Sequence, residues 1–397
     1  MENNLIDKIK NISELNFNEV VEIRRYLHKY PEISFNEEKT SAFIISKLEQ
    51  YGINNCKRYA KNGIIAHIEG VNPSSKIIAL RADIDALPIQ EQNNSDYCSV
   101  NDGVMHACGH DAHTASLLGT AKILTELKST FEGTIKLIFQ PAEEKLPGGA
   151  KLMIDEGALD NPKPDIIIGQ HVMPDYETGK VGFKSGVYMA STDEIYLTIS
   201  GKGGHAATPK EVTDTVLIAS KIIVATKNFV SSTPTSEPTI LSYGKVIANG
   251  ATNIIPNEVR VEGTFRAFNE TWRKEVHLKI NEIVAQIAKE HGGKCEIEII
   301  KGYPFLINDK KITENAIDFA SQYIGNENII DMDVRMTAED FAYYTQLYPS
   351  TFYRLGIRKK GDQIDPLHSS TFDIDEESLK IGMGLMAWLA VSFLNQK

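Results

Sequence analysis

Apolar and polar positions follow two different patterns along the chain. Up to about residue 190, short continuous Ile/Leu/Val runs alternate with segments whose apolar residues recur every three to four positions. Continuous apolar runs between helices are typical of parallel strands that are buried on both faces. The expected strands are 63–68, 77–80, 134–139 and 166–169, and the expected helices are 15–28, 36–52 and 111–127. This part of the pattern predicts an α/β fold with a mainly parallel sheet flanked by helices.

The order of the elements changes near Ser191 and changes back near Pro304. Between these points the chain predicts the βαββαβ order of a ferredoxin-like α+β unit, about 110 residues long. Its segments are strand 194–200, helix 213–229, strands 239–247 and 258–268, helix 270–291 and strand 294–300. Helices at 312–324, 338–347 and 376–393 and a strand at 351–355 follow. We expect one domain of residues 1–190 plus 301–397, interrupted by a second domain of residues 191–300.

Composition and charge narrow the functional classes. The 397 residues include 42 basic and 53 acidic side chains, a net charge of −11, which argues against nucleic-acid binding because such proteins present a basic surface. Four cysteines are too few for a disulfide scaffold, so we expect free thiols in a reducing compartment. No run reaches the roughly 18 apolar residues of a membrane span, and the N-terminus lacks a signal-peptide core. We therefore expect a cytoplasmic protein without a membrane partner.

The densest cluster of metal-binding residue types lies at residues 105–114. His106, Cys108, His110 and His113 fall within eight positions of a chain that has ten histidines. Cys108 and His110, two positions apart on a turn that leads into a helix, can point at one ion, and thiolate and imidazole suit zinc and other late divalent metals. His106 and His113 are open to either a supporting or a structural role.

Carboxylates and imidazoles also follow four predicted strands. Ligands gather at the carboxyl ends of strands in open α/β sheets. The residues are Asp83 and Asp85 after strand 77–80, Glu143 and Glu144 after 134–139, His171 after 166–169, and His368 after 351–355. Beside a metal, one of the two adjacent glutamates can bind the ion while the other stays free as a general acid/base, which is hydrolysis chemistry. Asp83 and Asp85 either cap the strand end or orient a metal-binding side chain.

Four motifs resemble the metal-dependent amidohydrolases, a family that includes aminoacylases, hippurate hydrolases, auxin–amino acid conjugate hydrolases and related carboxypeptidases. They are Arg81–Pro88, His106–Asp111, Gln140–Glu144 and Gly201–Ala206, in the family's order over nearly the whole chain. The resemblance implies two divalent metal ions (zinc, manganese, cobalt or nickel) bound by Cys108, His110, Glu144, His171 and His368. It also implies that Glu143 is the general acid/base. Cys108 places the chain in the hippurate hydrolase-like branch, and because a thiolate can bridge two ions, we expect it to be the bridge.

The resemblance assigns roles to the inserted domain as well. It implies a zinc-peptidase-like catalytic domain with a lid that forms a homodimer or higher homo-oligomer. His205 is implied to reach across the dimer and polarise the scissile carbonyl, and Asn253 and Arg266 to contact the substrate. A substrate carboxylate would give Arg266 a bidentate partner. Thr337 stands where this family often has glycine, a departure that bears on the pocket wall.

Together these features predict a hydrolase that cleaves the amide bond of an N-acetyl or N-benzoyl type amino acid, giving a carboxylic acid and a free amino acid. A carboxypeptidase, a dipeptidase or an N-acetyl-diaminopimelate deacetylase would use the same metal site. Two further interpretations stay open: a Cys108 nucleophile with a histidine base, and a catalytically silent metal-binding dimer, which would not need Glu143. A cytidine-deaminase-type zinc site is excluded, since no Cys-x-x-Cys pair follows the histidine motif.

Overall fold

The computed structural model describes residues 2–396, and the chain folds into two compact units. The first unit comprises the chain up to Gly186, Ile307–Asp333 and the segment from Asp340 onward. The second comprises Val187–Leu306 and Val334–Glu339. The lid and dimerisation roles of the inserted segment stay predictions.

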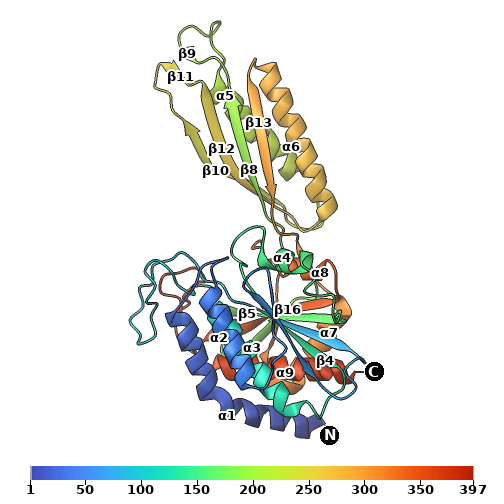
Figure 1. The fold of residues 1–397 in the computed structure, drawn as a ribbon. Helices are drawn as coiled ribbons and strands as arrows, with labels where there is room; N and C mark the ends of the chain where they lie inside the picture. The colour runs from blue at the N-terminus through green and yellow to red at the C-terminus, as the bar shows by residue number, and fades with distance from the viewer. Residues whose placement is uncertain (1, 397) are drawn as a thin grey trace. The chain divides into compact units, whose positions relative to one another are not determined.

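A mixed sheet forms the centre of the first unit (Figure 1). Over residues 2–396 its strands are ordered β1-β2-β4-β3-β5-β16-β6-β15. They are β1 (Lys57–Tyr59), β2 (Gly63–Glu69), β3 (Ile77–Asp83), β4 (Thr134–Gln140), β5 (Ile166–Glu177), β6 (Val181–Phe183), β15 (Ile329–Asp331) and β16 (Ser350–Arg358). The central strands β4, β3, β5 and β16 run parallel, so their carboxyl ends meet at one edge. Every residue of β4 is buried, as a sheet covered on both faces requires.

Helices cover both faces of this sheet. They are α1 (Glu2–Lys29), α2 (Glu38–Gln50), α3 (His110–Leu127), α4 (Gly149–Asp155), α7 (Lys310–Ile324), the short 3₁₀ helix Asn326–Asn328, α8 (Ala342–Thr345) and α9 (Ser378–Asn395). Helices α3 and α9 pack against β3 with α1 across both of them, while α4 and α8 contact β4 and β16. Among the described residues, α9 is the one helix that could span a membrane by length and composition, but 83% of it is buried, as in the core helix of a globular domain.

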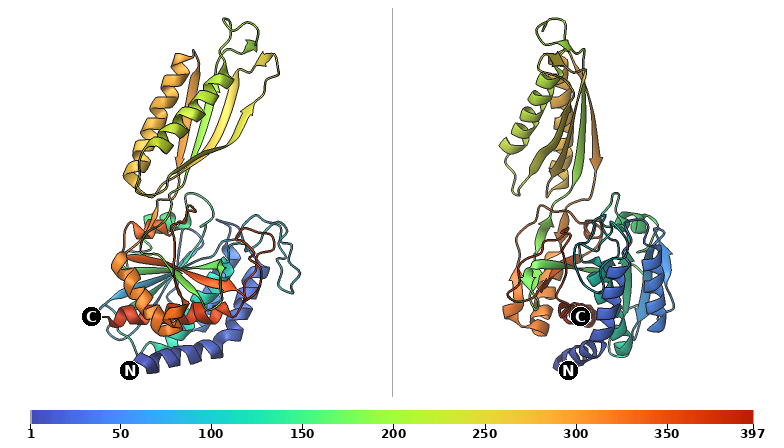
Figure 2. Two further views of the ribbon diagram at one scale, coloured as in Figure 1. Left: turned by 180° about the vertical axis from the view of Figure 1, so that it is seen from behind. Right: turned by 90° about the vertical axis from the view of Figure 1, so that its left-hand side faces the viewer.

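The second unit is a four-stranded antiparallel sheet with two helices on one face (Figure 2). Its elements are β8 (Asp193–Ser200), α5 (Thr215–Ser232), β10 (Ile240–Ala248), β12 (Glu258–Arg266), α6 (Glu270–Glu290) and β13 (Lys294–Lys301). Alternate residues of β8 are buried against the helices, the period of a sheet with one open face. The short strands β9 (Gly204–His205) and β11 (Ile254–Ile255) pair as a separate ribbon, and β7 (Gly186–Met189) and β14 (Leu306–Asn308) lie where the chain passes between the units.

The predicted fold class is confirmed: a mostly parallel sheet flanked by helices, with an inserted βαββαβ unit. Three predictions of single elements were wrong. The first helix begins at Glu2 rather than near residue 15, and β5 continues beyond Gly169 to Glu177. Of the predicted helix 338–347, only Ala342–Thr345 is α-helical.

Candidate active site

The carboxyl edge of the parallel strands collects the predicted metal-binding residues. Glu143 and Glu144 follow β4, His171 lies within β5, and His368 is in the loop after β16. Cys108 and His110 flank Gly109 at the start of α3, where Gly109 has φ 79°. A Cβ on Gly109 would lie 2.5 Å from Val172 Cγ2, so only glycine allows this turn to pack against β5.

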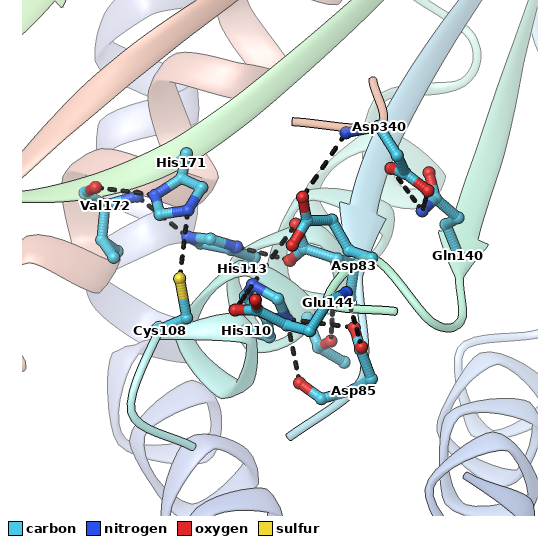
Figure 3. A network of polar contacts seen from close by, with 12 residues as sticks. Asp83, Asp85, Cys108, His110, His113, Gln140, Glu144, His171, Val172 and Asp340 are labelled. Atoms are coloured by element: carbon cyan, nitrogen blue, oxygen red, sulfur yellow. Dashed lines mark hydrogen bonds and ion pairs between the residues drawn. The ribbon is translucent and has the colours of Figure 1, made fainter. Parts of the chain in front are cut away.

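The donor atoms of these residues form two neighbouring groups that share one sulfur. Cys108, His110 and His171 make one group, and Cys108, Glu144 and His368 make the other, with all donor atoms of a group within 4.8 Å of one another. Cys108 Sγ lies 3.5 Å from His171 Nε2, and Glu144 Oε1 lies 3.2 Å from His368 Nε2. Figure 3 shows Cys108, His110, His171 and Glu144 converging. The structure thus brings the five predicted ligands together, with Cys108 in the shared position.

Hydrogen bonds determine which nitrogen each buried histidine presents. His110 Nδ1 donates to the carbonyl of Asp85 at 2.9 Å, and His171 Nδ1 donates to the carbonyl of Val172 at 2.7 Å. Both rings therefore turn their Nε2 lone pairs toward the cluster. Within the described part of the chain, His110 Nε2 is buried and has no hydrogen-bond partner. A buried nitrogen without a partner is costly, and a metal ion is a ligand that would satisfy it.

The charges of the cluster also fit a cation. Burial, and then the charge of Glu144, raise the pKa of the Cys108 thiol. Hydrogen bonds to Cys108 and Glu144 raise the pKa of His368 to about 10, although burial opposes this. Protons therefore compensate the negative groups of the cluster, and divalent ions can take their place with proton release. The mixed nitrogen, oxygen and sulfur donors suit zinc and other late divalent metals.

His113 and His106 have structural rather than metal-binding roles. His113 Nδ1 bonds Asp83 Oδ1 at 2.5 Å, and its Nε2 accepts the amide of Val172 at 2.9 Å, so neither nitrogen is available to a metal. His113 instead ties β5, next to His171, to β3. His106 is buried, and burial lowers its pKa to about 4, so it is a neutral core residue at physiological pH.

Asp85 and Asp83 bind residues of the cluster or residues next to it. Asp85 Oδ1 lies 3.2 Å from His110 Nδ1, and Asp85 Oδ2 accepts the amide of Glu144 at 3.0 Å. Asp83 bonds His113 and accepts from Arg81 Nη1 at 2.6 Å. These contacts favour the orienting role over a simple strand cap. Burial alone would raise the pKa of Asp85, but its bond to His110 lowers it, so this carboxylate stays ionised and holds the imidazole proton.

Glu143 belongs to a further group of close donor atoms, with His110 and Glu144, but to neither of the groups that contain Cys108. Its side chain is 7% exposed, and one of its oxygens lies within 4.8 Å of donor atoms of His110 and Glu144. Its Oε1 also accepts the amide of Asp340 at 3.4 Å. The two adjacent glutamates therefore occupy different positions, which is what a division between metal ligand and general base requires.

A buried network behind Glu143 was not predicted from the sequence. Arg81 is fully buried and donates to Asp83, to Asp340 at 2.9 Å and to Gln140 at 2.9 Å. Gln140 in turn donates to Asp340 at 2.8 Å. Arg81, Asp83 and Gln140 lie inside the motifs described above and Asp340 does not, and an arginine within a strand resembles a surface residue until its carboxylate partners are placed around it.

The other predicted site residues lie in the second unit. His205, in β9, pairs with Ile254 of β11, and the amide of Ala206 donates to the carbonyl of Asn253 at 3.0 Å. His205 and Asn253 are thus brought together and are both exposed. The amide of Ala207 donates to His205 Nδ1 at 3.1 Å, so the neutral ring carries its proton on Nε2.

Arg266 ends β12, at the opposite end of the sheet from the β9–β11 ribbon. It is half-buried, and among residues 2–396 no hydrogen bond or ion pair joins its guanidinium to another group. Burial lowers its pKa, and the nearby charge of Asp193 opposes the effect. A partly desolvated guanidinium without a partner is suited to binding an anion.

Comparison with known proteins identifies the family. Residues 79–391 match the model of peptidase family M20/M25/M40. The chain belongs to this family. It is accordingly a hydrolase that acts on amide bonds, as the resemblance of its motifs implied.

Relatives within the family differ in their named activities. The chain is 41% identical over 305 residues to the N-acyl-L-amino acid amidohydrolase of Geobacillus stearothermophilus, covering 77% of this chain and 80% of that protein. It is 35% identical over 398 residues to thermostable carboxypeptidase 1 of Saccharolobus solfataricus, covering 99% and 100%. It also resembles the crystal structure of a dinuclear metal-binding M20 peptidase from Bacillus subtilis, with a TM-score of 0.82, 33% identity and coverage of 97% and 100%. A two-metal site is therefore known in a relative.

Proposed function

We propose that this M20 protein hydrolyses the amide bond of N-acyl amino acids and releases a carboxylic acid and a free amino acid. Three features support the proposal. Of two adjacent glutamates, Glu144 joins the donor group of Cys108 and His368, whereas Glu143 is close to His110 and Glu144 only on that side of the cluster. A partly buried arginine lacks a partner. A relative at 41% identity bears the name N-acyl-L-amino acid amidohydrolase.

Glu143 is the proposed general acid/base. It takes a proton from the attacking water and returns it to the leaving amine, because a carboxylate that binds no metal keeps its basicity. Bound to Cys108, His110, Glu144, His171 and His368, divalent ions would supply Lewis acidity to activate water and polarise the carbonyl. Burial of Glu143 keeps its carboxylate close to the reacting atoms and away from bulk water.

Arg266 is the residue that indicates a substrate with a free carboxylate. An N-acyl amino acid has one free carboxylate next to the scissile amide, and guanidinium binds carboxylate through two parallel hydrogen bonds. Because burial lowers the pKa of Arg266 and no described group offsets its desolvation through a bond, a bound anion would gain more there than at an exposed arginine. The α-carboxylate of the substrate is the proposed partner.

His205 is the proposed donor to the carbonyl oxygen, and the fold of the second unit supports its action on another subunit's substrate. The ribbon that holds His205 adjoins the Glu258 end of β12, whereas Arg266 is the last residue of that strand. Eight residue steps at about 3.3 Å separate the two ends by roughly 26 Å. One small substrate cannot contact both residues of a single chain, so a homodimer that exchanges His205 is proposed.

The central test uses enzyme reconstituted with zinc, manganese, cobalt or nickel. Glu143→Ala should keep both metal ions, measured by elemental analysis, and lose roughly 10²–10⁴-fold in kcat on N-acetyl and N-benzoyl amino acids. Retained turnover in this variant at full metal content would refute the assignment. A chelator should abolish the activity of the native enzyme, whereas a Cys108 nucleophile would survive it. That alternative also has physical evidence against it, because burial raises the pKa of the thiol that would have to ionise.

Carboxypeptidase activity is the second candidate, favoured by the 35% identity to a carboxypeptidase over the full length of both chains. Both activities need a free carboxylate beside the scissile amide, so Arg266 serves either. Peptides with a free N-terminal amine differ from N-acyl amino acids only on the acyl side. A panel of matched dipeptides and N-acetyl amino acids should show higher kcat/KM for the acetylated compounds, and the reverse ranking would favour the carboxypeptidase.

A further inference from the structure

Glu37 is a buried carboxylate next to the active site that the proposed chemistry does not use. Its side chain is fully buried in the loop before α2. Its Oε1 accepts the amides of Ala142 at 2.8 Å and Phe35 at 3.0 Å, and its Oε2 accepts Asn62 Nδ2 at 2.9 Å. One of these partners, Ala142, immediately precedes Glu143 and Glu144.

The position of Glu37 in its own helix makes this contact unusual. Glu37 is the N-cap residue of α2, and an N-cap side chain normally accepts an amide of the first helical turn. Glu37 makes no such bond. Glu32 replaces it, because Glu32 Oε2 accepts the amide of Thr40 at 2.8 Å and its hydroxyl at 3.0 Å. The cap of α2 is therefore supplied by another residue, and Glu37 is directed to the loop after β4.

That loop holds a backbone conformation that needs support. Ala142 has φ 48°, in the left-handed region that costs a residue with a Cβ roughly 1–2 kcal/mol. Both of its peptide groups are held: Glu37 binds its N–H, and its carbonyl accepts the amide of Gly149 at 2.9 Å. Gly149 cannot be replaced, since a Cβ there would lie 1.8 Å from the carbonyl oxygen of Pro141. The turn at Ala142 sets the direction in which the chain leaves β4.

The same N-terminal loop also supports the far side of the glutamate pair. Ser34 Oγ donates to Asp85 Oδ2 at 2.6 Å, and that oxygen accepts the amide of Glu144 at 3.0 Å. The amides of Ala142 and Glu144 are thus both held by carboxylates. One is Glu37 of this loop, and the other is Asp85, which Ser34 of the loop binds. The loop ends at the start of α2.

We propose that Glu37 is a positioning residue for Glu143 and Glu144. By binding the amide of Ala142 it holds the left-handed turn that places one glutamate among the metal ligands and the other beside them. The inference rests on the proposed roles of the two glutamates. A residue about a hundred positions earlier in the chain thus determines which glutamate lies among the metal ligands and which stays free as the general acid/base.

The test compares three variants of the full-length protein. Glu37→Ala removes the acceptor for the Ala142 amide. Glu37→Gln keeps a carbonyl oxygen for the two backbone amides. Its new amino group takes the place of Oε2, which accepts Asn62 Nδ2, so the Asn62 amide must turn over to present Oδ1, a buried oxygen that has no partner among the described residues. Glu32→Ala is the matched control, because it removes a carboxylate–backbone contact from the same loop without touching the segment after β4.

Each variant is measured for kcat and KM and for Co²⁺ affinity of the metal-free protein, followed by the visible absorption of the Co²⁺–thiolate bond. Glu37→Ala should lower kcat at least tenfold with KM within about twofold, and should weaken Co²⁺ binding roughly 10–100-fold. Glu37→Gln should restore both values to within about threefold of the native protein. Glu32→Ala should lower the melting temperature but leave kcat and Co²⁺ affinity unchanged.

Native kcat and Co²⁺ affinity in a folded Glu37→Ala protein would overturn the inference, and so would an equal loss in Glu32→Ala. If Glu37→Ala does not fold, Glu37→Asp, which keeps the charge but withdraws it by one methylene, should show the same losses, and native values in it would also overturn the inference. Failure of the native enzyme on N-acyl amino acids would refute the proposed function instead. The Co²⁺ affinities would still decide the role of Glu37, because they require no substrate.

Discussion

The two units hold their candidate functional residues in opposite ways. In the first unit the buried imidazoles of the cluster each have a partner that fixes their orientation, Asp85 for His110 and the carbonyl of Val172 for His171, and of the five predicted ligands only His368 is exposed. In the second unit His205 and Asn253 are exposed, and Arg266 has no bond to a described group. The first unit is therefore organised before any ligand arrives, whereas the residues of the second unit need a substrate or another subunit to complete their contacts.

The second unit also buries charged side chains, so its exposed candidate residues are not explained by a lack of buried charge. Asp193 at the start of β8 is fully buried and paired with Arg273, whose Nε lies 2.9 Å from Asp193 Oδ2. Burial would raise the pKa of Asp193, but the hydrogen bond from Arg273 lowers it. This pair stabilises the end of the sheet where Arg266 lies, yet leaves Arg266 without a partner. The contrast between the units therefore concerns function rather than folding.

The largest expected effect is the recovery of activity when two inactive variants are combined in one dimer. Glu143→Ala and His205→Ala should each lose at least roughly 10²-fold in kcat. If His205 acts across a dimer, co-expressed and separately tagged variants should recover about a quarter of native activity, because half of the dimers are mixed and each mixed dimer has one intact site. Purified mixed dimers with no more activity than either parent would contradict the exchange of His205.

The buried network of the first unit should be far more sensitive than a surface ion pair of the second. Arg81→Met removes the buried guanidinium that Asp83 and Asp340 share and should lower the free energy of unfolding by about 3–5 kcal/mol. Arg260→Met, which removes an exposed pair with Glu258, should cost less than about 1 kcal/mol. Thermal and urea unfolding of both variants provide the measurement. Equal losses would show that the two regions are not organised differently.

Arg266→Ala tests whether the second unit depends on the substrate for completion. The variant should raise KM for N-acyl amino acids by roughly 30–150-fold, since a charged hydrogen-bonded pair is worth about 2–3 kcal/mol. Stability should change little because no described group bonds Arg266. The matched control is chemical: a substrate with its carboxylate converted to an amide should bind the native and variant enzymes alike. An unchanged KM would remove Arg266 from the substrate site.

Lys136 gives the smallest effect, a pH dependence confined to the first unit. Its side chain is buried and donates to the carbonyl of Ala158 at 3.0 Å, and burial lowers its pKa to about 8. The unfolded chain has a lysine pKa near 10.4, so between about pH 8 and 10 the unfolded state binds more protons and stability rises with pH. Any stability gained by Lys136→Met at pH 7 should shrink by roughly 1–2 kcal/mol by pH 9.5. Urea unfolding of the native protein and of Lys136→Met at pH 7 and pH 9.5 provides the measurement, and a difference that stays constant over this range would contradict the lowered pKa of Lys136.

Several departures from the predictions have one physical cause. The strand after residue 166 was predicted to end at Gly169 because Gln170 and His171 are polar. In the fold they stay in β5, since Gln170 accepts the hydroxyl of Tyr353 at 2.9 Å and His171 turns to the donor cluster. The predicted helix from 338 fails at Asp340, whose carboxylate is held by Arg81 and Gln140. A buried polar residue and a solvated one have the same sequence signal, and only the partners distinguish them.

Glu37 shows the same limit for the site. In the sequence it is one of two adjacent acidic residues at a helix start, where acidic side chains are favourable in any protein. Only the approach of Ala142, about a hundred positions later, gives Glu37 a different partner from Glu38, which is exposed and pairs with Lys61.

The sequence by itself determined the fold class and the insertion, because hydrophobic period is a local property of the chain, and the candidate ligands came from the resemblance of its motifs to a known family. The tertiary structure decided which of those residues converge: Cys108 between two donor groups, His113 on the backbone of β5, Glu143 beside Glu144, and Arg266 at the opposite end of its sheet from His205. These choices depend on buried hydrogen bonds between distant segments, and the energy of such a bond is defined only when the partner is in place.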